Sequence, residues 1–307
     1  MRRSLSIDVL KIILAFFVVF LHMHLLRDSY PKLSYVLVNG LFRIGVPVFL
    51  IITGYYFYHI DTAGKLKKWL VRLFLLYALW SVIYIPFWKD DDSWILNVIF
   101  GYHHLWYLIG TFFAGIILFF LRKKSTVTLA AMSLILFCCG YGIQLLGNLH
   151  PFPGKADSTL NAYPLYRNFL FVCFPFLSIG FLIKKLNTEV KLKPSLFQVL
   201  LVTGLVIFEA FCNYQFIGLN KKDSIDLLFS LMIACPLVFL YGKSKVLLSD
   251  SKILANLSTA IYLVHPLLMK LMLGRHFSAY ETAVFIVVLL IVSILLVYAN
   301  RKIKYLL

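Results

Sequence analysis

Long runs of apolar residues follow one another along almost the whole chain, and short polar segments separate them. Each run has roughly 17–25 residues, the length that a helix needs to cross the hydrocarbon core of a bilayer. Ten such runs lie near residues 7–26, 35–59, 69–88, 104–121, 127–148, 166–183, 196–217, 224–241, 253–272 and 280–300. An even number of crossings puts both termini on one side of the membrane. The pattern predicts an all-α fold, a polytopic membrane helix bundle, with residues 1–307 as a single integral membrane domain.

The composition excludes a water-soluble enzyme. Hydrophobic residues make up 61% of the 307 residues and charged residues 14%, and the mean hydropathy is +0.88. Soluble domains have about 45–50% apolar and about 25% charged residues, so a soluble globule of this length could not bury so much apolar surface. The same values exclude disorder, because disordered chains have few aromatic and many charged residues. The five cysteines all lie in apolar runs, which is typical of buried helix positions rather than of a disulfide framework.

The basic residues indicate how the bundle lies in the membrane. A formal net charge of +17 suggests a nucleic-acid partner in a soluble protein, but the thirty Lys and Arg residues are sorted by side. Nineteen fall on the side of the termini and nine on the opposite side, while Lys11 and Arg43 lie inside expected spans. The positive-inside rule then puts both termini in the cytoplasm. We expect membrane lipids, and no nucleic acid, as partners of these cations.

The first expected helix carries three ionisable residues, Asp8, Lys11 and His22. An ionisable group inside a bilayer costs at least about 2.5–3.5 kcal/mol, so such groups are retained for a function or are paired. At about 100° per residue, Lys11 and His22 lie on one face and about 16 Å apart, and Asp8 can pair with Lys11 three positions later. The alternative is that Asp8 and Lys11 only anchor the helix at the headgroups, while His22 makes a contact within the bundle.

The histidines do not predict a metal centre. His22 and His24 are two positions apart and point about 200° away from each other on a helix. The adjacent His103 and His104 diverge in the same way. A zinc site needs ligands that converge, so no metal is expected.

Further polar groups interrupt the later spans. Arg43 precedes a Pro and two Gly residues in the second span, a combination that indicates a bend beside a polar cavity. Lys67, Lys68 and Arg72 open the third span and suit a phosphate-bearing ligand, although anionic lipid headgroups are the ordinary alternative. Glu209 is isolated in the seventh span.

Several of these segments, in the same order, resemble the acyltransferase-3 family of bacterial membrane acyltransferases. Lys11, ten intervening residues and His22 resemble the basic-x10-His motif in that family's first helix. The other similar segments are Arg43 to Tyr55, His104-Leu105-Trp106-Tyr107-Leu108, Arg167-Asn168, Phe174-Pro175-Phe176 with Gly180, and Ser258 to Pro266. The resemblance covers the whole chain. One departure lies in the third helix, where the family often has Arg-x-x-Arg and this chain has Lys67, Lys68 and Arg72.

Within the family, the chain is most similar to the membrane domain of VanT-type membrane-bound serine/alanine racemases. The likeness lies in Arg43 to Tyr56, His104 to Tyr107, Arg167-Asn168 and the isolated Glu209. Proteins of that group carry a soluble pyridoxal-phosphate racemase domain after the membrane part. The sequence ends at Leu307, seven residues after the last expected span, so that domain either is missing or lies beyond the sequence given. The membrane domain of that group is usually regarded as a serine-supplying module, so a transport role stays open.

The family resemblance implies a reaction and a location. The reaction is transfer of an acyl group, usually acetyl, from cytoplasmic acyl-CoA to a hydroxyl or amine of an envelope glycan, a cell-wall-related acceptor or a small molecule. Acetyl-CoA is then the acyl donor and co-substrate, and no metal takes part. The location is the bacterial cytoplasmic (inner) membrane.

The resemblance also implies roles for the residues singled out above. His22 is the general base, because imidazole titrates near neutral pH, and the catalytic group also contains Lys11, Asp8, Arg43 and Glu209. Arg43 either stabilises a developing oxyanion or holds Glu209. Lys67, Lys68 and Arg72 bind the phosphates of the acyl donor. The residues expected to bind the acceptor lie near the outer face: His104, Trp106, Tyr107 and Arg167. Aromatic side chains at this level are also typical of the interfacial belt.

Overall fold

The structure, a computed structural model, describes residues 3–91, 94–215, 225–245, 247–249, 251–272, 278–303 and 305–307. Within these ranges nine helices are long and apolar enough to cross a membrane, which confirms the predicted helical membrane bundle. The expected span near 224–241 corresponds to a shorter apolar helix, Leu231–Ser244. Residues 216, 217 and 224 of the expected spans lie outside the described residues.

The first half of the chain builds five spans. The elements, in order, are α1 (Leu5–His22), α2 (Pro31–Val38), η1 (Leu41–Ile44), α3 (Gly45–Phe57), α4 (Ala63–Tyr84), η2 (Ile85–Phe87), α5 (Trp94–Phe100), η3 (His103–Leu105), α6 (Trp106–Leu121) and α7 (Thr126–Asn148). The second span is composite, since α2, η1 and α3 together cover Pro31–Phe57. Arg43 therefore lies in a short 3-10 turn between two α-helices.

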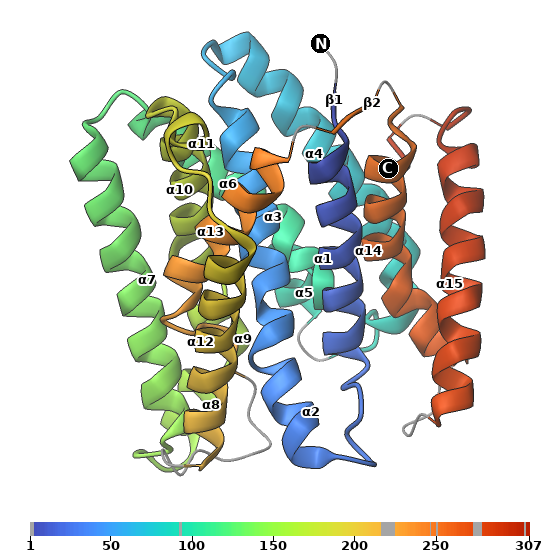
Figure 1. Ribbon diagram of the computed structural model, residues 1–307. Coiled ribbons are helices and arrows are strands. Elements are labelled where there is room, and N and C mark those ends of the chain that lie inside the picture. The colour runs from blue at the N-terminus through green and yellow to red at the C-terminus, as the bar shows by residue number, and fades with distance from the viewer. Residues whose placement is uncertain are drawn as a thin grey trace.

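The second half of the chain contains more interruptions. Its helices are α8 (Lys155–Leu160), α9 (Tyr163–Tyr166), the π-helical turn η4 (Phe169–Cys173), α10 (Phe174–Lys185), α11 (Thr188–Lys191), α12 (Leu196–Gln215), α13 (Leu231–Ser244), α14 (Ile253–Met272) and α15 (Ala279–Ala299). Two short strands, β1 (Arg3–Ser4) and β2 (Leu248–Ser249), pair antiparallel. Both ends of the chain lie in the upper part of the view in Figure 1, on the side of this strand pair.

Some helices are surrounded by protein and others lie at the edge. α1 and α3 occupy the middle of the view in Figure 1, with α7 and α15 at its two sides. α3 packs on α10, α1 packs on α14, and α14 packs on α15. In the most apolar window of the second span 72% of the residues are buried, compared with 22% for α15. Arg43, in the second span, is therefore held in the interior of the bundle.

Two glycines allow α3 and α10 to touch. A Cβ atom at Gly54 would overlap the backbone oxygen of Leu177, and a Cβ atom at Gly180 would overlap that of Ile51. Small residues at helix crossings let backbones approach closely in membrane proteins. This contact fixes α3, which follows Arg43, against α10.

The end of α1 differs from the sequence-based expectation. The helix stops at His22, although the apolar run predicts a span to residue 26. His24 and Leu26 have positive φ angles of 47° and 68°, in the left-handed region that an α-helix of L-residues does not continue through. His22 is therefore the last residue of the helix, beside a turn.

Candidate functional site

Two cavities enter the bundle, and each contains one end of the polar stripe on α1. The larger one, the His22 cavity, has a volume of about 590 Å³, and its polar lining includes His22, Arg27, Arg43, His103 and Arg167. The second, the Lys11 cavity, has a volume of about 290 Å³, and its lining includes Lys11, Thr53, Arg72, Tyr107 and Tyr262. Small-molecule sites usually have volumes of about 300–1,000 Å³, so both cavities are close to or within this range.

A narrow pocket, the Asp226 pocket, continues inward from the His22 cavity. Its volume is about 40 Å³, and its polar lining is His22, Arg43, Trp106, Arg167 and Asp226. It shares His22, Arg43 and Arg167 with the larger cavity. These three side chains therefore face a common space.

The His22 ring lies against two other imidazoles. Its centroid is 4.4 Å from that of His103 and 5.3 Å from that of His265. His265 is fully buried on α14, and its Nδ1 lies 3.1 and 2.8 Å from the backbone oxygens of Ile261 and Tyr262. Nδ1 must then carry the proton, which leaves Nε2 as an acceptor. Within the described ranges, no group of three or more His, Cys, Asp or Glu residues is arranged to hold a metal ion.

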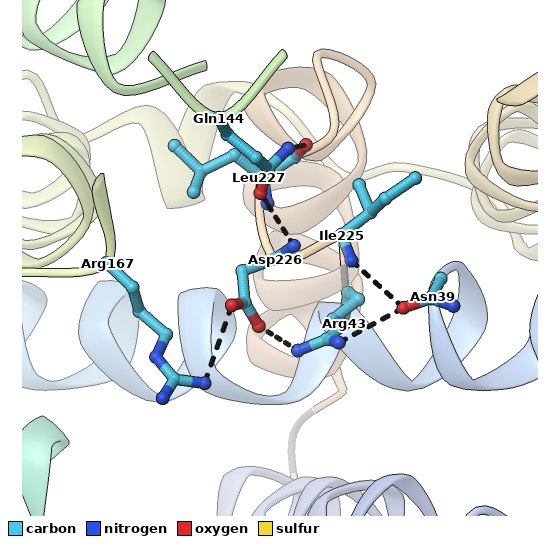
Figure 2. Close-up of polar contacts among 7 residues, drawn as sticks. All are labelled: Asn39, Arg43, Gln144, Arg167, Ile225, Asp226 and Leu227. Carbon is cyan, nitrogen blue, oxygen red and sulfur yellow. Dashed lines mark hydrogen bonds and ion pairs between the residues drawn. The ribbon is translucent and has the colours of Figure 1, made fainter. Parts of the chain in front are cut away.

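An ion-pair network lies beside the histidines (Figure 2). The two oxygens of Asp226 accept from Arg43 Nη1 and from Arg167 Nη1, the latter at 3.4 Å. Asn39 Oδ1 accepts from Arg43 Nη2 at 3.2 Å and from the N–H of Ile225 at 3.1 Å. The side chains of Arg43 and Asp226 are only 8% and 6% exposed. Ionised groups at such depth usually face the interior and are paired, as they are in this network.

The network depends on a non-helical segment, residues 225–230, that leads into α13. Gln144 Oε1 accepts from the N–H groups of Asp226 and Leu227 at 2.7 and 2.9 Å, and Gln144 Nε2 donates to the Leu227 oxygen at 2.9 Å. Glu209 accepts two backbone N–H bonds just before α13, both at 2.8 Å. Non-helical backbone inside a membrane protein needs such partners. The side chains of Asn39, Gln144 and Glu209 thus make the interruption possible.

Arg167 projects from a second interruption, between α9 and η4. Asn168 Oδ1 accepts from the N–H groups of Leu170 and Phe171 at 2.9 and 3.0 Å. The Asn168 amide nitrogen donates to two carbonyl oxygens of the preceding turn, both at 3.0 Å. Two interrupted spans therefore meet where Arg167 contacts Asp226, an arrangement common around binding sites in membrane proteins.

The Lys11 cavity combines cations with hydroxyl groups. Lys11 Nζ lies 3.9 Å from Asp8 Oδ1, which confirms the pairing expected from their spacing. Arg72, from α4, lines the same cavity. The hydroxyl oxygens of Thr53 and Tyr107 are 3.4 Å apart in its wall. Such a lining suits a ligand with an anionic end and a polar arm.

Three aromatic rings lie close together in the lining of the Lys11 cavity. The ring centroids of Phe49, Tyr107 and Tyr262 are 6.4, 6.5 and 5.7 Å apart, and all three residues line the Lys11 cavity. The Asp226 pocket is lined by Val46, one turn before Phe49, and by Trp106, next to Tyr107. We call these three rings the aromatic triangle. Two of them, Phe49 and Tyr107, therefore lie in the same helix turns as residues that line the Asp226 pocket.

The sequence model of the acyltransferase-3 family, described as an acyltransferase domain, matches residues 4–299. The chain belongs to this acyltransferase family. Both cavities, the Asp226 pocket and the aromatic triangle are built from residues within the matched range. Together with the nine apolar helices in the described ranges, the match identifies a multi-pass membrane protein of the acyltransferase class.

Two racemases are similar to this chain over most of its length. An amino-acid racemase from Enterococcus faecalis is 26% identical over 298 residues, 87% of this chain and 41% of the racemase. A serine/alanine racemase from Enterococcus gallinarum is 23% identical over 310 residues, 92% of this chain and 43% of the racemase. The chain thus spans less than half the length of either relative. No solved structure gives a significant match.

The fold gathers most of the predicted site residues into two groups. At the Asp226 pocket lie His22, Arg43, Trp106 and Arg167. At the Lys11 cavity lie Asp8, Lys11, Arg72 and Tyr107. Lys67 and Lys68 are exposed on α4, and Lys67 borders a separate apolar groove.

The structure differs from the sequence-based expectation at three positions. Tyr107 lies in the Lys11 cavity, because the first turn of α6 directs it toward α3, where its hydroxyl meets that of Thr53. His104 is only 1% exposed and packs in the core rather than lining either cavity. Arg43 pairs with Asp226 rather than with Glu209, whose carboxylate is occupied by backbone N–H groups.

Sequence reasoning missed Asp226. The available signal was an acidic residue inside the expected apolar span 224–241, where ionisable groups are rare. Its partners Arg43 and Arg167 are 183 and 59 residues away in the sequence, so spacing could not identify them. His103 was considered only as a metal ligand, whereas the fold places its ring on His22.

Proposed function

We propose that this protein transfers an acyl group, acetyl by family default, from acyl-CoA in the Lys11 cavity to a hydroxyl or amine of an acceptor in the His22 cavity. His22 acts as the general base. The acceptor is an envelope glycan, a cell-wall-related compound or a small molecule, and the enzyme works in the bacterial cytoplasmic membrane.

The position of His22 is the observation that carries the proposal. Its side chain lines the His22 cavity and also the Asp226 pocket. Residues in the same first turns of α3 and α6 line the Asp226 pocket and the Lys11 cavity. A base that removes a proton from an acceptor must lie within reach of both the acceptor and the acyl carbon. Imidazole suits this role, because a neutral ring nitrogen can accept a proton and then donate it.

The Lys11 cavity is the proposed donor site. Lys11 and Arg72 supply positive charge for the phosphates of acyl-CoA, and the hydroxyl groups of Thr53 and Tyr107 offer hydrogen bonds to its polar arm. Lys67 and Lys68, exposed near Arg72 on α4, extend the cationic surface toward the part of the donor outside the cavity.

In the proposed step, His22 accepts the proton of the acceptor hydroxyl or amine while the acceptor atom attacks the thioester carbonyl carbon. The carbon–sulfur bond then breaks, sulfur leaves with the electron pair, and the proton passes from His22 to sulfur. The products are the acylated acceptor and the free CoA thiol. Arg43, held by Asp226 in the same pocket as His22, can stabilise the negative charge that develops on the carbonyl oxygen.

His22→Gln tests the assignment of the base. Glutamine keeps the approximate size and hydrogen bonding of the imidazole but cannot take up the proton. We expect transfer of radiolabelled acetyl groups to cell-wall glycan fragments to fall by about 10²–10⁴-fold, while acetyl-CoA binding and thermal stability are retained. His59→Gln, exposed in the loop after α3, is the matched control and leaves transfer unchanged. Full turnover in His22→Gln, or no acetyl-CoA binding by the wild-type protein, contradicts the proposal.

A second candidate function is the transport or supply of a small amino acid such as L-serine. The two relatives are racemases by name, and two interrupted spans meet at a charged site, as in several transporter folds. Uptake of radiolabelled L-serine into proteoliposomes separates the two functions. A transporter takes up serine without CoA, and the acyltransferase proposed above does not.

A further inference from the structure

The His22 cavity has a positively charged wall. Arg27, Arg43 and Arg167 contribute to it, and none of the described residues that line it is acidic. The carboxylate of Asp226 lies behind the two inner arginines, in the narrower pocket. At the mouth, partial burial and then the positive charges of Arg27 and Arg43 lower the pKa of His24. The cavity therefore favours an anionic occupant.

Arg167 is set up to receive a planar anion. Its guanidinium lies 4.3 Å from the ring centroid of Tyr163 and 5.2 Å from that of Trp106, so aromatic rings fix its orientation. Nη1 is directed to Asp226, whereas the buried Nε has no hydrogen-bond partner among the described residues. The side chain is 19% exposed. Nε is thus an unpaired donor on a side chain that lines both the His22 cavity and the Asp226 pocket.

We infer that the acceptor carries a carboxylate, which binds the Nε edge of Arg167 with support from Arg27. A guanidinium edge and a carboxylate match in a planar, bidentate geometry. The inference rests on the proposed function, because it defines the class of acceptor at the same site. That class is a small hydroxyl- or amine-bearing acid, either a free amino acid or the acidic sugar unit of a glycan.

The geometry also places the reacting group. His22 and Arg167 both line the His22 cavity and the Asp226 pocket, so a carboxylate on Arg167 leaves a neighbouring hydroxyl or amine beside the imidazole. The rings of Tyr35 and Tyr214, with centroids 5.0 Å apart, form part of the cavity wall and offer apolar contact to the rest of the acceptor. A volume of about 590 Å³ accommodates an amino acid or a monosaccharide acid.

Equilibrium binding to the purified protein in lipid nanodiscs tests the inference with two pairs of probes. One pair is D-glucuronate and D-glucose, and the other is L-serine and ethanolamine, which lacks the carboxylate. In at least one pair, we expect the compound with the carboxylate (D-glucuronate or L-serine) to bind and the compound without it (D-glucose or ethanolamine) not to bind. Glucuronate alone indicates an acidic sugar as the natural source of the carboxylate, and serine alone indicates a free amino acid.

Three variants locate the site. Arg167→Lys keeps a positive charge for Asp226 but lacks the planar edge, so we expect it to weaken carboxylate binding at least about tenfold. Arg27→Gln, at an exposed position, weakens binding several-fold without disturbing the ion-pair network. Arg301→Gln is the matched control, because Arg301 is exposed, follows α15 and does not line the His22 cavity. It leaves binding unchanged.

Four results would overturn the inference. The first two are equal binding of glucuronate and glucose, and tighter binding of inorganic phosphate than of either carboxylate. The other two are no binding of either carboxylate, and unchanged carboxylate affinity in Arg167→Lys. Acetyl-CoA binding is measured on the same samples to keep the two proposals apart. Carboxylate binding without acetyl-CoA binding contradicts the proposed function but still supports a carboxylate site at Arg167. His22-dependent transfer to neutral acceptors without carboxylate binding contradicts only the inference.

Discussion

Asp226 joins two arginines that belong to different spans. One of its oxygens accepts from Arg43 in η1, just before α3, and the other accepts from Arg167 between α9 and η4 (Figure 2). Its own backbone N–H is held by Gln144. A short carboxylate with both oxygens engaged keeps the two guanidinium groups at fixed positions beside His22, which is what a charged substrate site requires.

Asp226→Asn tests this role, because it keeps the shape of the side chain and removes its charge. The buried Arg43 and the partly buried Arg167 then lose their counter-charge. Breaking a buried ion pair in this way costs about 3–5 kcal/mol. We expect a lower melting temperature in detergent and a loss of acyl transfer. Asp157→Asn is the control, since Asp157 pairs with His150 at 2.8 Å at a more exposed site, where pairs contribute about 0–1 kcal/mol. Equal melting temperatures for both variants contradict the role of Asp226.

Glu189 predicts a pH dependence of stability at the opposite end of the bundle from the His22 cavity. Burial opposes ionisation of its carboxyl group, but hydrogen bonds from Lys184 Nζ and the Tyr55 hydroxyl, both 2.8 Å, outweigh burial and lower its pKa. A pKa below that of the unfolded chain, about 4.3, means that the ionised group stabilises the fold above this pH. The stabilisation disappears as the pH falls through the folded-state pKa.

The measurement compares wild type with Glu189→Gln. We expect the variant to melt at a lower temperature at pH 7 and the difference to shrink as the pH is lowered below about 4. A difference that stays constant over this pH range excludes a contribution from ionised Glu189.

At the scale of helices, the contact of α3 with α10 depends on the absence of two side chains. Gly54→Ala and Gly180→Ala each place a methyl group on a backbone oxygen of the facing helix, so the helices must separate. Overpacking of this kind usually costs about 1–3 kcal/mol. We expect reduced yield of folded protein and a lower melting temperature in fluorescence-detected size-exclusion assays.

Gly142→Ala in α7 is the matched control for the glycine variants. A Cβ at this position meets nothing within 4 Å, and alanine improves helix propensity by up to about 1 kcal/mol. Its stability should equal or exceed that of the wild type. If all three alanine variants have the same melting temperature, Gly54 and Gly180 are not needed for the close approach of α3 and α10.

The helices also mark what sequence can predict. Hydropathy identifies the spans because length and apolar content are local properties, and helical periodicity is enough to pair Asp8 with Lys11. The interruption at 225–230 cannot be predicted in this way, since it is stabilised by side chains such as Gln144, 82 residues distant. The same limit applies to the site. Lys11 and His22 follow from one helix, whereas the Asp226 network exists only when distant helices meet.

At the scale of the whole molecule, the prediction concerns orientation. The distribution of Lys and Arg predicts cytoplasmic termini, with the turns near Asp91 and Lys155 on the outside. Single cysteines at these two positions, in a background without the five native cysteines, should react with an impermeant thiol reagent added to intact cells. A cysteine at Lys123 should be protected. Labelling at position 123 in place of the other two reverses the orientation.

The short helix α13 has a consequence for how the chain enters the membrane during synthesis. Its 14 residues extend about 21 Å, less than the hydrocarbon core of about 30 Å. The segment before it, residues 225–230, is non-helical and carries the ionisable Asp226, so this region is poorly suited to insertion alone. Every described side chain that satisfies this segment comes earlier in the chain: Asn39, Arg43, Gln144, Arg167 and Glu209. When residues 225–244 leave the ribosome, their polar partners are already in place. Insertion of this region is therefore a docking event onto an assembled partial bundle, and substitutions of those five residues should act on biogenesis before they act on catalysis.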